Sequence, residues 1–359
     1  MYRESKSLIW IVLVSAACTA SNGTNESDGS SSTASSADTT TTLTTSTTTE
    51  TGTTVDASSS EASSSGTTES ADDSSSTGGD VDLAGNCALD VHVGGFVAAY
   101  EQTYSAFSGT VSDGVVPLNV LEQIAEDGDC RLLRRNNPFC DPGCAAGETC
   151  DFDGNCIPYP SNHDIGVVTV TGLEKPVMIE PTPPTFSYFD TMLPHPGFEP
   201  GAIITVTSTG GDYSPITLQG IGVDMIVPGQ EEIHLDADVS QDVTWTPGDP
   251  RVTMRLQIAV DQHGTSPLAM ICEAPADAGT LTISGALMTE FLEHGISGFP
   301  SADFFFETVD SMDVEPGCVD FAVRSHDQIM VFITGHTPCN STPDCPKGQT
   351  CDVMNQTCV

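Results

Sequence analysis

Positively charged side chains are scarce in this chain. Its 359 residues include ten Lys and Arg against fifty Asp and Glu, which gives a formal net charge of −40 at pH 7. A surface of this sign repels phosphate backbones and anionic lipid head groups, so nucleic-acid binding is excluded as a function. Two interpretations of this negative net charge stay open: the charge either keeps the protein soluble in a salty medium, or it attracts cations or a basic partner.

Long apolar runs and enzyme motifs are also missing. No run of about 18 or more apolar residues occurs, so the sequence predicts no transmembrane helix. It contains no Gly-x-Ser-x-Gly, His-Glu-x-x-His or Gly-x-Gly-x-x-Gly motif, and its eight histidines are scattered. An extracellular hydrolase remains an alternative only if its site is assembled from distant residues. His263 near Asp261 and His326 beside Asp327 are the neighbourhoods that would supply one.

Residues 1–18 have the pattern of a lipoprotein-type signal peptide. A short segment with two basic side chains is followed by seven apolar residues and then by small residues directly before Cys18. A cysteine at this position resembles the bacterial lipobox, which implies lipidation of Cys18 and a membrane anchor. The lipobox usually has Leu where Ser15 stands. Ordinary signal-peptidase cleavage, giving a freely secreted protein, therefore stays open.

Residues 19–86 contain almost only Ser, Thr, Gly, Ala, Asp and Glu, and they include no Lys, Arg, Pro, Cys or aromatic residue. Such a segment has too little apolar surface to offset its conformational entropy, so we predict a disordered acidic stalk. As a flexible coil it would span about 45 Å. The stalk would hold the folded part away from the membrane.

Thirteen cysteines are too many for a reducing cytosol, so the sequence predicts a protein that works outside the cytoplasm. With lipidation of Cys18, the expected location is the outer membrane at the cell surface. Without Cys18, twelve cysteines remain as disulfide candidates. We expect Cys87 to pair with Cys130, and Cys272 with Cys318. The other candidates form two sets of four: Cys140, Cys144, Cys150 and Cys156, then Cys339, Cys345, Cys351 and Cys358.

The two sets of four cysteines are an internal repeat. Residues 136–160 and 336–359 both contain Cys-x-x-Gly-[Glu/Gln]-Thr-Cys-Asp, a short turn and a final cysteine. Segments this short cannot build a hydrophobic core, so two disulfides are expected to hold each of them. Ligation of zinc by four cysteines is the alternative. Each set allows three disulfide connectivities, and the sequence does not choose among them.

The rest of the chain predicts a mainly β fold, a β-sandwich flanked by the small disulfide-rich modules. Residues 87–135 are expected as a small β-rich segment with a short helical stretch near Val120–Ala125, and residues 161–335 as the β-sandwich domain. Arg251–Val260 alternates apolar and polar residues most clearly. One helix is expected near Ala286–His294, ended by Gly295. Trp245 is expected to anchor the core.

Two groups of carboxylates could hold calcium. The segment that starts with Asp151 and Asp153 resembles the first part of a calcium-binding loop with oxygen ligands, although the spacing of its residues departs from the EF-hand pattern. Asp236 and Asp238, followed by Asp242, would lie on alternate positions of a strand and so face the same way. The alternative is that these are solvated turn and edge carboxylates. No other cofactor is predicted.

Several motifs together resemble those of uncharacterised surface lipoproteins of myxobacteria-like bacteria. They are the signal ending in Cys18, the Ser/Thr stalk, the cluster that begins Cys140-Asp-Pro, Trp245-Thr-Pro with the later His263-Gly264, and Gly317-Cys318. The resemblance covers most of the chain. The resemblance implies that the chain is a lipoprotein of the cell surface with β-rich modules, and it implies no activity.

From these features we predict a tethered binding or structural lipoprotein of the cell surface. Its ligand would be a polysaccharide or another envelope protein. Tyr188 and Tyr213, which fall in predicted loops, are candidates for stacking on sugar rings. The sequence leaves the oligomeric state open.

Overall fold

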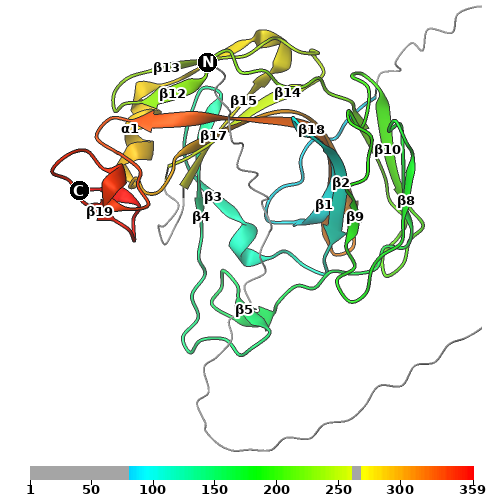
Figure 1. Ribbon diagram of the computed structural model, residues 1–359. Coiled ribbons are helices and arrows are strands. Elements are labelled where there is room, and N and C mark those ends of the chain that lie inside the picture. The colour runs from blue at the N-terminus through cyan, green and yellow to red at the C-terminus, as the bar shows by residue number, and fades with distance from the viewer. Residues whose placement is uncertain (1–80, 261–267) are drawn as a thin grey trace, which may run out of the picture. The chain divides into compact units, whose positions relative to one another are not determined.

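Strands make up most of the secondary structure in the computed structural model, which describes residues 81–260 and 268–359 (Figure 1). These residues belong to one compact unit, residues 73–359. The prediction of a mainly β fold is confirmed. The signal peptide, Cys18 and the stalk up to residue 80 lie outside the described residues, as do Asp261 and His263. Within the described ranges, no helix has the length and apolar character needed to cross a membrane.

A ten-stranded mixed sheet dominates the unit. Its strands run in the order β3-β4-β15-β14-β17-β18-β1-β2-β9, and β12 also pairs with β18. The strands are β1 (His92–Tyr100), β2 (Ser105–Val111), β3 (Leu121–Asp127), β4 (Cys130–Arg135), β9 (Tyr188–Asp190), β12 (Glu232–Leu235), β14 (Thr253–Ala259), β15 (Leu268–Pro275), β17 (Ser301–Val314) and β18 (Gly317–Ile333). Residues 87–135, expected as a segment of their own, thus supply four strands of the sheet that residues 161–335 complete.

The alternation predicted for residues 251–260 is confirmed in β14. Met254, Leu256 and Ile258 are fully buried, and β14 pairs antiparallel with both β15 and β17. The helix predicted near Val120–Ala125 is wrong, because these residues enter β3 and pair with β4. The stretch is rich in helix-forming residues, but pairing with a neighbouring strand outweighs that weak local preference.

A four-stranded sheet packs against one face of the large sheet and makes the predicted sandwich. It runs β11-β10-β7-β8, with β7 (Val168–Thr171), β8 (Val177–Ile179), β10 (Ile203–Ser208) and β11 (Thr217–Ile221). Figure 1 shows β8 and β10 beside β1, β2 and β9. The sheets approach closely at Gly220, where an added Cβ would lie 2.4 Å from Val323 Cγ2. Phe96, Phe107 and Phe321 fill the space between the sheets.

The remaining elements are short. β13 (Gln241–Thr244) pairs with β16 (Thr280–Ile283), and the predicted helix is confirmed as α1 (Gly285–Glu293), whose N-cap Ser284 accepts a hydrogen bond from Leu287 N. Trp245 is buried, and its Nε1 donates to the Ala276 carbonyl at 2.7 Å. Three short 3₁₀ turns are η1 (Pro117–Asn119), η2 (Ala276–Ala278) and η3 (Thr342–Asp344).

Two disulfides join parts of the chain that are far apart in sequence. Cys87 bonds to Cys318, and Cys130 bonds to Cys272. The expected pairs Cys87–Cys130 and Cys272–Cys318 are therefore wrong. The reason lies in the strand pairing: β1 runs parallel to β18, which brings Cys318 to the start of β1, and β4 lies antiparallel to β15, with Cys130 directly opposite Cys272.

The two cysteine-rich modules share one connectivity, in which the first cysteine bonds the third and the second bonds the fourth. The bonds are Cys140–Cys150 and Cys144–Cys156 in one module, and Cys339–Cys351 and Cys345–Cys358 in the other. Each module contains a two-stranded hairpin: β5 (Glu148–Cys150) with β6 (Cys156–Pro158), and β19 (Cys351–Asp352) with β20 (Thr357–Cys358). The sulfur atoms are used in disulfides, so the zinc alternative does not describe these modules.

Residues 83–87 form a strap against the edge of β17. Gly85 N donates to the Val309 carbonyl at 3.1 Å, and Ala84 N donates to the Asp310 carboxylate at 3.1 Å. The stalk was expected to run to residue 86, but residues 83–86 belong to this strap, so that boundary is corrected. The strap is held in place because Cys87 is bonded to Cys318.

Candidate ligand-binding site

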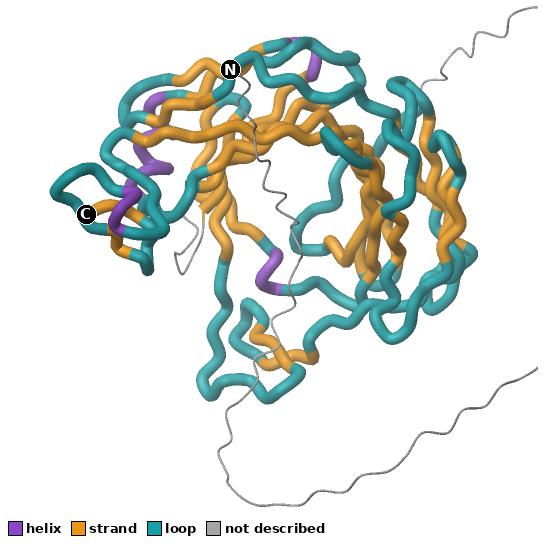
Figure 2. Tube along the Cα trace, viewed as in Figure 1, coloured by secondary structure: helices purple, strands orange, loops and turns teal. Residues whose placement is uncertain are grey.

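One face of the large sheet packs on the core, and the other carries a set of polar and charged side chains. We call this second side the concave face, because β3 and β4 bend toward it at one end and β1 and β2 at the other (Figure 2). Side chains alternate along a strand, so Arg255, Phe305 and Arg324 lie on this face between buried residues of the opposite face.

Phe305 is the centre of a stack of cationic groups. The guanidinium carbons of Arg255 and Arg324 lie 5.5 and 5.4 Å from the centre of its ring. The His326 ring stacks on the same phenyl ring, with 4.9 Å between centroids. The negative face of an aromatic ring attracts cations, so the stack fixes all three basic groups in place.

His326 holds two carboxylates from distant parts of the chain, Glu101 directly after β1 and Asp303 in β17. Its Nδ1 lies 2.9 Å from the Glu101 carboxylate, and its Nε2 lies 3.0 Å from the Asp303 carboxylate. Burial alone would lower the pKa of His326, but the hydrogen bonds to Asp303 and Glu101 outweigh it and raise the pKa to about 9. The imidazole is therefore charged at neutral pH.

Glu307 and Arg324 are the most buried charged groups of this face. Glu307 is 4% exposed and lies 3.6 Å from Arg255 Nη1; burial raises the pKa of its carboxyl, and the two arginines oppose that rise. Burial likewise lowers the pKa of the Arg324 guanidinium. Arg324 Nε is buried and has no hydrogen-bond partner among the residues that the structure describes. A buried donor without an acceptor is costly, so a bound group that accepts from it would be favoured.

Two further ion pairs lie on the concave face. Arg131 Nη1 is 3.1 Å from Glu273, and His92 Nε2 is 3.2 Å from Asp320. Donation from the imidazole to the Asp320 carboxylate is the largest influence on His92 and raises its pKa. Together with the groups around Phe305, the concave face therefore carries five basic and five acidic side chains. The basic ones are His92, Arg131, Arg255, Arg324 and His326, and the acidic ones are Glu101, Glu273, Asp303, Glu307 and Asp320.

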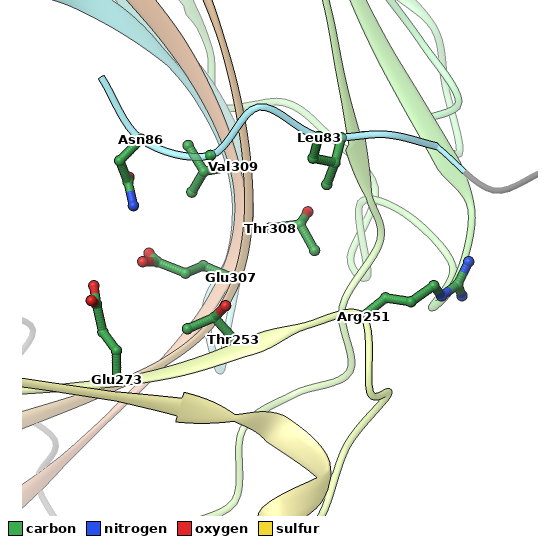
Figure 3. Close-up of a pocket in the computed structure, with 9 residues that line it drawn as sticks. Leu83, Asn86, Arg251, Thr253, Glu273, Glu307, Thr308 and Val309 are labelled. Carbon is green, nitrogen blue, oxygen red and sulfur yellow. The ribbon is translucent and has the colours of Figure 1, made fainter. Parts of the chain in front are cut away.

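Two adjoining cavities open on the concave face. One of about 280 Å³ is lined by Glu273, Glu307 and the strap residue Asn86, and Figure 3 shows both carboxylates pointing into the same space while Arg251 lies apart. The other, of about 350 Å³, shares Asn86 and Glu273 with the first and continues past Arg131 and Arg255. Together they form a groove walled by donors and acceptors.

Of the two hydrolase neighbourhoods predicted from the sequence, only His326 with Asp327 lies in the described ranges, and it does not form a catalytic arrangement there. Both ring nitrogens of His326 are bonded to carboxylates, while the Asp327 carboxylate accepts from the side chain of Gln102 and from the backbone of Gln328. Ser105 Oγ lies 3.2 Å from His195 Nδ1, but Ser105 is only 1% exposed, which leaves its hydroxyl no access to a substrate carbonyl.

Of the two tyrosines expected to contact sugars, Tyr213 lies in a loop as predicted, but Tyr188 does not. Tyr188 is fully buried in β9, where its hydroxyl accepts from Ile165 N. Tyr213 is partly buried against the core. The exposed aromatic residues near this region are instead Phe189, which is 64% exposed, and Tyr104, which is 52% exposed.

The carboxylate of Asp151 has a structural role in its module. Its oxygens accept hydrogen bonds from the backbone N–H groups of Asp153 and Asn155, and these bonds lower the pKa of Asp151. Asp352, at the equivalent place of the second module, accepts in the same way from the backbone N–H groups of Met354 and Asn355. The repeated Cys-Asp pattern is therefore explained by turn formation, and the calcium hypothesis at Asp151 and Asp153 stays a prediction.

Asp236, Asp238 and Asp242 do not share one strand face. β12 ends at Leu235, Asp238 lies in a turn with a positive φ of 61°, and its carboxylate accepts from Thr289 in α1. The Asp242 carboxylate accepts from Thr282. The expected alternation fails because the chain turns directly after β12.

The residues that line the groove or form the stack around Phe305 beside it were missed by sequence reasoning. They are Arg131, Arg255, Glu273, Phe305, Glu307 and Arg324. The alternation in β14 indicates that Arg255 is opposite the core, but no motif connects it with β17, β18 or the strap. That connection depends on the strand order.

The molecule is thus a mainly β protein of an oxidising, extracytoplasmic compartment, since six disulfides stabilise it. No family model matches the chain, and no curated protein matches it. Among solved structures, the FN1–FN3 domains of chicken CNTN1 are similar with a TM-score of 0.17 and 7% identity, over 62% of this chain and 69% of that one. A score this low carries no argument about fold or function.

Proposed function

We propose that this protein is a cell-surface lipoprotein that binds a neutral polysaccharide in the groove of its concave face. The observation that carries the proposal is the charge balance of the groove. Residues 81–359 contain 39 acidic and eight basic side chains. The groove nevertheless pairs Arg131 with Glu273, Arg255 with Glu307 and His92 with Asp320.

A groove with this balance suits ligands rich in hydroxyl groups. Each hydroxyl both donates and accepts, so alternating guanidinium and carboxylate groups can satisfy several of them at once. An anionic polymer would meet the strongly acidic surface around the groove and be repelled. The two adjoining cavities provide room for more than one sugar ring. A neutral glycan chain therefore fits the groove better than an acidic one.

The anchor and the stalk complete the proposal. Lipidation of Cys18, with residues 19–80 as a tether, would place the groove at a distance from the membrane. We expect a clickable fatty-acid analogue, supplied to cells that export the chain, to label the wild-type protein and not the Cys18→Ser variant. An unlabelled wild type would mean a freely secreted protein and would leave the groove unaffected.

Arg131 and Arg134 provide a matched test of the groove. Both lie on β4, their side chains are 38% and 39% exposed, and each forms an ion pair with a glutamate. They differ in position, because Arg131 lines the groove, whereas Arg134 pairs with Glu122 on the opposite face of the sheet. The full-length chain is exported in a bacterial host so that its disulfides form. Affinity electrophoresis then measures its binding to soluble β-glucan and dextran, and sedimentation its binding to cellulose and chitin.

We expect at least one neutral polysaccharide to bind, and Arg131→Gln to weaken that binding by about tenfold, the effect of one hydrogen bond to a charged group. Arg134→Gln should bind as the wild type does. The proposed function fails if no neutral polysaccharide binds, if only anionic alginate binds, or if the two variants behave alike.

A further inference from the structure

We infer that the concave face carries a second part of the polysaccharide site, an aromatic platform at β1, β2 and β9 on which pyranose rings stack. The inference rests on the proposed function and extends the groove beyond its two cavities. The platform consists of Tyr104 and Phe189, with Arg324 at the side nearest the groove. No cavity of the groove includes these three residues.

The strand register places Phe189 on the concave face. Phe189 lies opposite Ser108, and Tyr188 lies opposite Gly109. Neighbouring residues point to opposite faces, and Tyr188 is fully buried in the core, so Phe189 points to the concave face. This accounts for the 64% exposure of a phenyl ring in the middle of a strand.

Tyr104 directly precedes β2 and is followed by Ser105, which is 1% exposed and faces the core. Neighbouring residues of an extended chain point to opposite faces, so Tyr104, which is 52% exposed, points to the concave face. Burial is the main influence on the Tyr104 hydroxyl and raises its pKa; the charge of Glu101 also raises it, and that of Arg324 lowers it. Ser108 follows Tyr104 by four residues, and a strand rises about 3.4 Å per residue, which puts the two rings about 14 Å apart. Each ring would therefore take a different sugar of one chain.

The floor between the two rings is uncharged. On β1 and β2 it consists of small side chains, all partly or fully exposed: Val97, Ala99, Ala106 and Ser108. A pyranose ring has an apolar face of C–H groups that packs on aromatic and small apolar side chains. A charged polymer or a peptide rich in basic residues would find no partner on this floor. The absence of charge therefore favours the same neutral glycan that the groove accepts.

Arg324 joins the platform to the groove. Its guanidinium is held over Phe305, and its buried Nε has no acceptor in the described part of the chain. Arg324 lies opposite Ala99 on β1 and opposite Glu307 on β17, so it stands at the boundary between the uncharged floor and the cavities. A ring oxygen or hydroxyl of a sugar stacked on Tyr104 would supply the missing acceptor. The stack would thus fix where one ring of the chain sits.

The test uses the same full-length chain and the same neutral polysaccharides, with variants at exposed positions that leave the core intact. Tyr104→Ala and Phe189→Ala should each weaken binding by roughly fivefold through loss of stacking. Tyr104→Phe keeps the ring and should bind as the wild type does. Phe139→Ala is the control, because Phe139 is 83% exposed and belongs to a cysteine-rich module rather than to β1, β2 or β9.

The outcomes separate the two proposals. If a neutral polysaccharide binds and Arg131→Gln weakens it, but both aromatic variants bind normally, the platform is wrong and the groove stands. If Tyr104→Phe binds as weakly as Tyr104→Ala, the hydroxyl and not the ring is used, which also overturns stacking. If no neutral polysaccharide binds the wild type, both proposals fall. Arg324→Lys, which keeps the charge and removes the planar fork, should weaken binding in the same sense as Tyr104→Ala.

Discussion

Replacing both Cys87 and Cys318 by Ala is expected to lower the free energy of unfolding by about 5 kcal/mol, the chain-entropy value for so long a loop. The two cysteines are 231 residues apart in sequence. Their bond therefore restricts the unfolded chain more than any other disulfide in the described ranges. Denaturant titration of the oxidised wild type and the double variant, followed by circular dichroism, measures the difference.

The control for this prediction is removal of Cys144–Cys156, whose cysteines are only 12 residues apart. The same chain-entropy relation gives a loss of about 3 kcal/mol for that bond. Since this disulfide lies in a small module, its removal should also leave the unfolding of the large sheet cooperative. Equal losses for the two double variants, or a larger loss for Cys144–Cys156, would show that loop length does not govern the stability of this fold.

Raising the pH from about 6 to about 10 is expected to remove about 3 kcal/mol of stability through His326 alone, as follows from a shift of its pKa from 6.5 to about 9. The folded-state pKa is above the unfolded one. The contribution is therefore fully present below about pH 6.5 and is lost as the pH rises through 9. At high pH the neutral ring no longer holds Glu101 and Asp303, which then repel each other.

His326→Gln tests this directly. Denaturant titrations at both pH values should show that wild type loses about 3 kcal/mol more than the variant, because glutamine does not titrate. His234→Gln is the matched control, because His234 is 60% exposed and its ion-pair partner Glu232 lies on the same strand. If His326→Gln shows the same pH dependence as the wild type, the imidazole does not carry the ionic link between Glu101 and Asp303.

Local patterns in the sequence predict the local parts of this fold. The alternation in residues 251–260 gives β14, and the stretch before Gly295 gives α1, because each depends on residues close together in the chain. The repeat of four cysteines likewise predicts two similar modules. The disulfides Cys87–Cys318 and Cys130–Cys272 could not be predicted, because they follow from strands that pair across more than a hundred residues.

The candidate site was beyond prediction for the same reason. Arg131, Arg255 and Arg324 come from three strands, β4, β14 and β18, that become neighbours of one face only through the order of the sheet. Tyr188 was a reasonable candidate for solvent exposure, but a strand of three residues gives no periodic signal. Its neighbour Phe189 is the exposed ring, and only the register of β9 distinguishes the two.

The parallel pairing of β1 with β18 has a consequence for how the protein is made. Strand β18 lies between β17 and β1 at the middle of the large sheet, yet it is among the last strands in the chain. Contacts over such sequence distances form slowly. A chain threaded through a membrane from its N-terminus would thus stay without its central strand until nearly all of it had emerged.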